Sequence, residues 1–180
     1  MDYFKELQAA LASIPSDKIA TLLKLIKSCI QLEKDIYVIG NGGSASISDH
    51  FCCDFNKGSL THPSKSLSRA FSLANNPALV SALNNDIGLV NIFSWQIDRF
   101  VKAGDIVIVI SSSGTSQNIE NALKACLSKS ISTFVLTGMT GGSLVSLTPN
   151  NIKINSSNYG IVEDCHMSIL HMVSQVVNNY

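Results

Sequence analysis

The segment Asp105-Ile106-Val107-Ile108-Val109-Ile110 decides the fold class of this sequence. A run of β-branched residues without polar alternation is typical of a strand that is covered on both faces, as in a parallel sheet. A second apolar run, Asp35-Ile36-Tyr37-Val38-Ile39-Gly40, is too short for a helix and ends in glycine. The two runs therefore predict buried strands of an α/β protein.

Helical and strand patterns alternate on both sides of these runs. Further strands are predicted at 68–73, 132–137 and 152–155. Helices are predicted at 2–12, 17–32, 44–55, 78–83, 89–102, 116–128 and 161–178, with Ser16 as a candidate N-cap. Strands separated by helices imply right-handed crossovers. We therefore expect a three-layer α/β fold, a five-stranded parallel sheet flanked by helices, with a helical N-terminal segment at 1–33.

Composition limits the classes of function. Of the 180 residues only 14% are charged, whereas a soluble domain normally carries about 25%, so we expect other subunits to cover part of the surface. The formal net charge is zero and no basic stripe is visible, which disfavours a nucleic-acid partner. Five cysteines without a C-x-x-C pair predict neither disulfides nor a thiolate zinc site. Without a basic leader or a long apolar segment, we expect a cytoplasmic protein that does not enter the membrane.

The first predicted strand runs into the glycine loop Gly40-Asn41-Gly42-Gly43-Ser44-Ala45. This loop fits the G-x-G-x-x-A pattern of dinucleotide-binding proteins. That pattern also needs an acidic residue roughly 20 positions later to hold a ribose, and the segment from Ser59 to Asn85 contains none. Dinucleotide binding is therefore disfavoured, and the glycines are better explained by a close approach of the backbone to another ligand.

The run at 105–110 leads into the serine loop, Ser111-Ser112-Ser113-Gly114-Thr115-Ser116, and then into a predicted helix. Several hydroxyl groups at a helix N-terminus can hold a phosphate without cations. Helix capping alone needs one hydroxyl, and the loop supplies more. No lysine follows the glycine, so the loop is not a nucleotide P-loop. A phosphomonoester is the predicted ligand class.

Two predicted helices carry ionisable side chains in apolar surroundings. His50 and Asp54 are spaced i,i+4 and so share one helix face, although most such pairs are solvated surface pairs. The last helix carries Glu163, His166 and His171 among apolar residues, where ionisable groups are costly unless partnered. Spacing alone does not decide which histidine faces a site.

Taken together, these motifs resemble the sugar isomerase (SIS) domain family, and within it the phosphoheptose isomerases. The resemblance covers almost the whole chain. The segments that carry it are Gly40–Ala45 followed by His50-Phe51, Asn85-Asp86, Ser111–Ser116, Leu136-Thr137-Gly138 with Gly141-Gly142, and Glu163-Asp164-Cys165-His166 followed by His171.

The resemblance implies one flavodoxin-like SIS domain over residues 1–180, with segment 1–33 used in oligomerisation. It implies a homotetramer with active sites at subunit interfaces. It also implies an aldose–ketose isomerase that converts sedoheptulose 7-phosphate to D-glycero-D-manno-heptose 7-phosphate through an enediol, for surface-polysaccharide synthesis.

The resemblance further implies roles for residues at the matching positions. Asp54 would act as the base and His171 as the acid. A zinc ion would lie between His50, Asp54, Glu163 and His171. The sugar phosphate would be lined by Asn41, Gly42, Gly43, Ser44, Asp54, Asn85, Asp86, Ser111, Ser112, Ser113, Ser116 and Glu163.

Two departures from the family pattern leave the substrate and the metal open. Many members have Glu where this chain has Asp54, which is shorter by one C–C bond. Position 163 is commonly Gln in the family, and Glu163 adds a negative charge. Two alternatives therefore stand beside the main hypothesis: an isomerase of a different sugar phosphate, and a non-catalytic SIS module that binds a protein partner, as replication-initiator-associating members do. Such modules tend to lose the carboxylate and the distal histidine, which this chain keeps.

Overall fold

A five-stranded sheet organises the structure, a computed structural model that describes residues 2–58 and 68–178. All strand pairs are parallel, in the order β2-β1-β3-β4-β5, which confirms the predicted sheet. The strands are β1 (Ile36–Ile39), β2 (Ala70–Ser72), β3 (Ile106–Ser111), β4 (Ser132–Thr137) and β5 (Asn151–Lys153).

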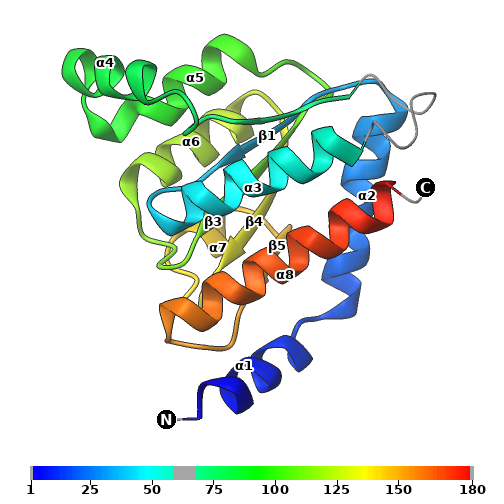
Figure 1. The fold of residues 1–180 in the computed structure, drawn as a ribbon. Helices are drawn as coiled ribbons and strands as arrows, with labels where there is room; N and C mark the ends of the chain where they lie inside the picture. Colours follow the sequence, from blue (N-terminus) through cyan, green and yellow to red (C-terminus); the bar gives the residue numbers. More distant parts are fainter. Residues whose placement is uncertain (1, 59–67, 179–180) are drawn as a thin grey trace.

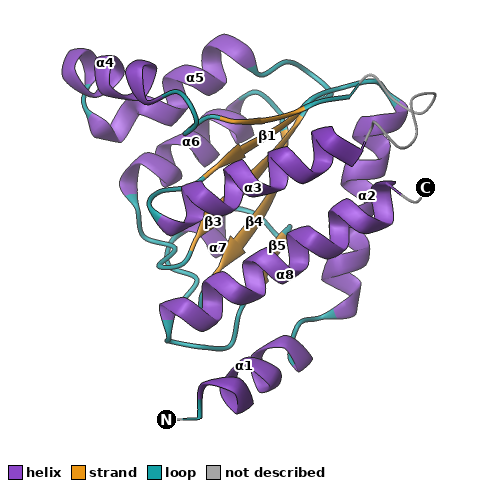
Figure 2. Ribbon diagram, viewed as in Figure 1, coloured by secondary structure: helices purple, strands orange, loops and turns teal. Residues whose placement is uncertain are grey.

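Helices cover both faces of the sheet, as Figures 1 and 2 show. They are α1 (Tyr3–Ala12), α2 (Ser16–Gln31), α3 (Gly43–Gly58), α4 (Pro77–Ile87), the 3₁₀ helix η1 (Leu89–Asn91), α5 (Ile92–Phe100), α6 (Gln117–Ser128), α7 (Leu144–Leu147) and α8 (Tyr159–Asn178). No helix in the described residues is long and apolar enough to cross a bilayer.

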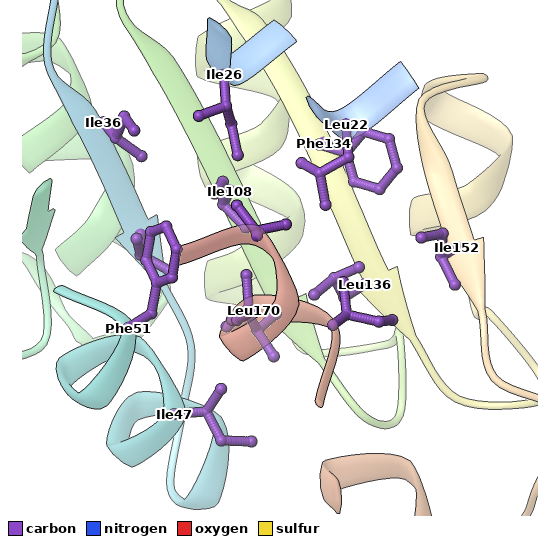
Figure 3. Packing of buried hydrophobic residues seen from close by; sticks show 14 of the residues in the cluster. Leu22, Ile26, Ile36, Ile47, Phe51, Ile108, Phe134, Leu136, Ile152 and Leu170 are labelled. Atoms are coloured by element: carbon purple, nitrogen blue, oxygen red, sulfur yellow. The ribbon is translucent and has the colours of Figure 1, made fainter. Parts of the chain in front are cut away.

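Successive apolar residues of β1, β3 and β4 belong alternately to two hydrophobic clusters, one on each face of the sheet. Ile108 of β3 points to the face that α2, α3 and α8 cover, and Val107 points to the face that α5 and α6 cover. Figure 3 shows the first cluster, where Phe51 of α3 and Leu170 of α8 approach Ile108. This two-sided burial explains why β3 is apolar at every position from Ile106 to Ile110.

Several predicted boundaries are corrected. Ser16 is the first residue of α2 and not its N-cap, because Pro15 is extended and its carbonyl already accepts the N–H of Ile19. The helix predicted at 89–102 begins as η1 and ends at Phe100, after which Val101 is extended. The strand predicted at 68–73 is shorter in the structure, where β2 spans Ala70–Ser72. The short helix α7 lies outside every predicted element.

His166 lies in the buried interface between α8 and the sheet. Its side chain is fully buried, and Nε2 lies 3.3 Å from the carbonyl oxygen of Thr137 at the end of β4. Burial disfavours the charged imidazolium and lowers the pKa of His166 to about 4. This histidine is therefore part of the core. Of the two histidines on the last helix, His166 is thus not the one that faces a site.

The buried His166 predicts a loss of stability at acidic pH. The unfolded chain takes up this proton near pH 6.5, whereas the folded protein takes it up only near pH 4, because the folded-state pKa is about 4. Stability from this group is complete above pH 6.5 and is lost as the pH falls toward 4. At pH 5 the expected loss in the free energy of unfolding is about 2 kcal/mol relative to pH 7.

Urea unfolding at pH 7 and pH 5 measures this loss. The variant His166→Asn cannot take up the proton, so its unfolding free energy should fall by correspondingly less between the two pH values, whatever its stability at pH 7. Equal losses in the two proteins would contradict the assignment.

Candidate active site

The glycine loop allows α8 to lie against the start of α3. Gly42 has a φ of +53°, a left-handed conformation that favours glycine. A Cβ atom on Gly43 would lie 2.7 Å from Oε1 of Glu163, which is on α8. The carboxylate of Glu163 therefore occupies the space that any larger residue at position 43 would need.

Two side-chain amides connect the glycine loop to the start of α6. The Nδ2 group of Asn41 donates to Oδ1 of Asn118 at 2.9 Å, and the Nδ2 group of Asn118 donates back to Oδ1 of Asn41 at 3.0 Å. Asn118 is in the first turn of α6 and is buried. This reciprocal pair fixes the N-terminus of α6 relative to the N-terminus of α3.

The serine loop turns sharply at Gly114. The N–H of Gly114 donates to the carbonyl oxygen of Ser111 at 3.1 Å and to its hydroxyl at 3.2 Å. Gly114 has a φ of +69°, and a Cβ there would overlap the backbone of Gly141 in the turn after β4. Ser116 is the N-cap residue of α6, yet its side chain makes no capping hydrogen bond. Its hydroxyl is therefore available for a ligand.

A pocket of about 160 Å³ lies between the serine loop and α8. Its lining residues are Asn41, Ser44, Ile110, Ser111, Ser112, Ser113, Ser116, Tyr159 and Glu163. Two helices start at this pocket, since Ser44 is in the first turn of α3 and Ser116 precedes α6. Helix N-termini and hydroxyl groups are the donors that bind a phosphate in the absence of lysine or arginine. Ser112 Oγ is buried without a hydrogen-bond partner in the described residues.

His171, not His166, faces the predicted site. Asp54 Oδ2 lies 3.3 Å from Nε2 of His50 and 3.7 Å from Nε2 of His171. The two imidazole rings meet edge to face, with centroids 5.0 Å apart. The side chains are 50%, 30% and 42% exposed for His50, Asp54 and His171, so a substrate or an ion can reach them. Helices α3 and α8 lie side by side over the sheet and hold this triad together (Figure 1).

The triad has the donor set of a metal site. The three ligand atoms all lie within 4.8 Å of one another. A tetrahedral zinc ion with bonds of about 2.0–2.1 Å separates neighbouring ligands by about 3.3 Å, close to the 3.3 Å and 3.7 Å found here. Two imidazole nitrogens and one carboxylate oxygen therefore fit such an ion.

The structure does not bring every predicted residue to one point. Glu163 lies beside Gly43 and lines the pocket between the serine loop and α8, which we call the phosphate-type pocket. Among the described residues, Glu163 is not part of the cluster of His50, Asp54 and His171 that could hold a metal. Asn85 and Asp86 are exposed on α4, where the Asn85 amide donates to Asp86 at 3.0 Å, and neither lines the pocket. Tyr159 lines the pocket but was missed, because nothing in the sequence marks the residue before Gly160 as a binding residue.

Comparisons with known proteins agree with this architecture. The family model described as "SIS domain" matches residues 2–138. A probable phosphoheptose isomerase of Thermoplasma volcanium is 31% identical over 99% of this chain and 90% of its own length. The phosphoheptose isomerase of Citrifermentans bemidjiense is 30% identical over 96% of this chain and 88% of its own length.

Solved structures give the same result. A phosphoheptose isomerase from Francisella tularensis superposes with a TM-score of 0.89 and 26% identity, over 98% of this chain and 93% of that one. The phosphoheptose isomerase of Neisseria gonorrhoeae shares the fold, with a TM-score of 0.88 at 23% identity over 99% of this chain and 94% of that one. With its parallel sheet, its serine loop and its matches over nearly the full chain, the protein belongs to the SIS-domain family and, within it, to the phosphoheptose isomerases.

Proposed function

We propose that this protein is an aldose–ketose isomerase that converts sedoheptulose 7-phosphate to D-glycero-D-manno-heptose 7-phosphate. One observation carries the proposal: a carboxylate of α3 and an imidazole of α8, Asp54 and His171, lie 3.7 Å apart on the same two helices that line a phosphate-type pocket. A base and an acid beside an anion site are the minimum equipment for moving a carbonyl along a sugar phosphate.

The reaction needs two proton transfers at carbon and one between oxygens. Asp54 removes the proton from C1 of the ketose, and His171 donates to the carbonyl oxygen at C2, which gives the enediol. A proton then returns to C2 while the hydroxyl proton on O1 leaves, so that C1 becomes the aldehyde. The hydroxyl groups of the serine loop hold the phosphate during both steps and keep the reacting carbons beside the two side chains.

We propose that zinc binds to His50, Asp54 and His171, with Glu163 as the fourth ligand. A His171 that binds zinc through Nε2 carries no proton on that nitrogen, so the proton donation described above belongs to the metal-free site. When bound, the ion would polarise the carbonyl and stabilise the negative charge of the enediolate. The carboxylate of Glu163 lies two helical turns before His171 on α8, so it would approach the triad from the side of the pocket. Its charge would favour the cation more than the glutamine common in the family does.

The isomerase proposal predicts loss of turnover in two variants. Asp54→Asn and His171→Ala should each lower kcat by about a hundredfold or more, because each removes one proton-transferring group. Asp98→Asn changes an exposed aspartate that pairs with Lys129 and should keep full activity. The measurement is conversion of sedoheptulose 7-phosphate to the aldose, with incorporation of solvent deuterium at C2.

Other sugar phosphates distinguish the alternatives. Faster turnover of a six- or eight-carbon ketose phosphate than of the seven-carbon compound would change the substrate but keep the chemistry. A folded protein that turns over none of them would contradict the proposal and favour a non-catalytic binding module.

The zinc proposal predicts a metal affinity that depends on both helices. Isothermal titration with Zn²⁺ should give about one ion per chain, and His50→Ala or His171→Ala should weaken binding about tenfold or more. Glu163→Gln keeps an oxygen donor and should weaken binding less than Glu163→Ala. Equal affinity in all these variants and in Asp98→Ala would contradict the assigned ligands.

We further propose a homotetramer in which segment 1–33 takes part in assembly and the active sites lie at subunit interfaces. Phe4 of α1 is 80% exposed, which is costly for a large apolar side chain in water. Asn85 and Asp86 do not line the pocket of their own chain, so a role in substrate binding would require the pocket of a neighbouring chain.

A mixing experiment tests this assembly. Sedimentation should give the mass of four chains. Chains that carry Asp54→Asn and chains that carry Asp86→Ala, each inactive alone, should regain part of the activity when unfolded and refolded together, because a shared site receives one intact residue from each chain. A monomer in sedimentation, or no recovery in the mixture, would contradict the shared site.

A further inference from the structure

A second pocket lies on the outer edge of the sheet, away from the serine loop. Its volume is about 430 Å³, and it is bounded by α3, the edge strand β2 and the turn that leads into α4. None of the described residues that line it also lines the phosphate-type pocket. Asp49 and Cys53 of α3 line it, and each precedes a member of the His50–Asp54 pair by one position. They are therefore rotated by about 100° from the face that carries that pair.

Hydrogen bonds hold the walls of this edge pocket in place. The side-chain amide of Asn56 donates to the carbonyl oxygen of Ala70 at 2.8 Å and accepts from the N–H of Ala70 at 2.8 Å, which joins α3 to the open edge of β2. Asn76 accepts from the N–H of Leu79 and caps α4. The pocket is thus preformed between three fixed elements, as small-molecule sites usually are.

Two residues that line this pocket each have a buried polar atom without a hydrogen-bond partner among the described residues. Asp49 Oδ1 and Ser72 Oγ are both shielded from solvent, and neither has a hydrogen-bond partner among the described residues. A buried polar group without a hydrogen bond costs about 1–3 kcal/mol, and more if it is charged. Such atoms are uncommon in native proteins, and each requires an explanation such as a bound water, an ion or a functional role. Here both atoms belong to residues that line the same pocket.

The lining residues indicate the chemistry of the ligand. Among the residues that the structure describes, no lysine, arginine or histidine lines the pocket. The N-terminus of α4 beside it is already capped by the Asn76 side chain, so a phosphate or a carboxylate finds no charged partner among these residues. Asp49 needs a donor, while Ser72, Asn75 and Asn76 offer uncharged donors and acceptors. Vicinal hydroxyl groups, which both donate and accept, match this combination.

We propose that the edge pocket binds an uncharged saccharide at a site separate from the isomerase site. With small rotations of both side chains toward the pocket, the carboxylate of Asp49 accepts from sugar hydroxyl groups and the Ser72 hydroxyl completes its hydrogen bonding with the same ring. Unlike the ligand proposed for the serine loop, this saccharide carries no phosphate group. This inference does not depend on the isomerase proposal, because the two pockets have no described lining residue in common.

Cys53 supplies a direct readout. It lines the pocket and is exposed, whereas the other four cysteines, Cys29, Cys52, Cys126 and Cys165, are buried. Alkylation of Cys53 by iodoacetamide, followed by peptide mass spectrometry on the full-length protein, measures access to the pocket. Mannose, fructose and sedoheptulose are the probes, with inorganic phosphate, sedoheptulose 7-phosphate and a simple alkyl amine as comparisons.

At least one neutral sugar should slow alkylation of Cys53 in a saturable manner, while inorganic phosphate and the amine should not. Ser72→Ala should raise the sugar concentration needed for half-protection about tenfold and leave isomerase activity unchanged. The matched variant Ser128→Ala, whose hydroxyl donates to Ala125 on α6, should protect as the unchanged protein does.

Three results would overturn the saccharide site. They are no protection by any of the neutral sugars, equal protection by phosphate or the amine, and protection that rises with protein concentration instead of sugar concentration. The last result would identify the pocket as an interface between copies of the chain. If the protein has no isomerase activity but neutral sugars still protect Cys53, only the proposed function is contradicted.

Discussion

The packing of α8 against α3 is the contact on which the rest of the site depends. Phe51 of α3 and Leu170 of α8 are buried in the same cluster against the sheet, and the residues beside them in sequence, His50 and His171, meet at the exposed rim of that cluster. Apolar burial thus supplies the free energy that holds two histidines and Asp54 together. Without this contact, nothing would hold Asp54 and His171, which are more than a hundred positions apart in the sequence, in one site.

A second constraint fixes the phosphate-type pocket relative to that triad. The reciprocal amides of Asn41 and Asn118 join the two helix N-termini, and Gly43 leaves the space in which Glu163 lies. Preorganised donors bind an anion without the cost of ordering them at the moment of binding. Gly43 and Gly114 are therefore explained by close contacts within the protein itself.

The sequence predicted the sheet well because both faces of its strands are buried, so β3 is apolar at every position from Ile106 to Ile110. It also predicted the elements that carry the serine loop and the i,i+4 pair. It could not choose between His166 and His171, since that choice depends on which side of α8 meets Thr137 of the sheet. The position of Tyr159 in the pocket and the existence of the edge pocket could not be predicted for the same reason, because both depend on tertiary packing.

The most direct test of the central claim is a crystal structure of the protein with a bound sugar phosphate. The account predicts the phosphate among the hydroxyl groups of Ser111–Ser116, with C1 and C2 of the sugar within hydrogen-bond reach of Asp54 and His171. A phosphate bound away from the serine loop, or reacting carbons turned away from both side chains in every copy of the assembly, would contradict it.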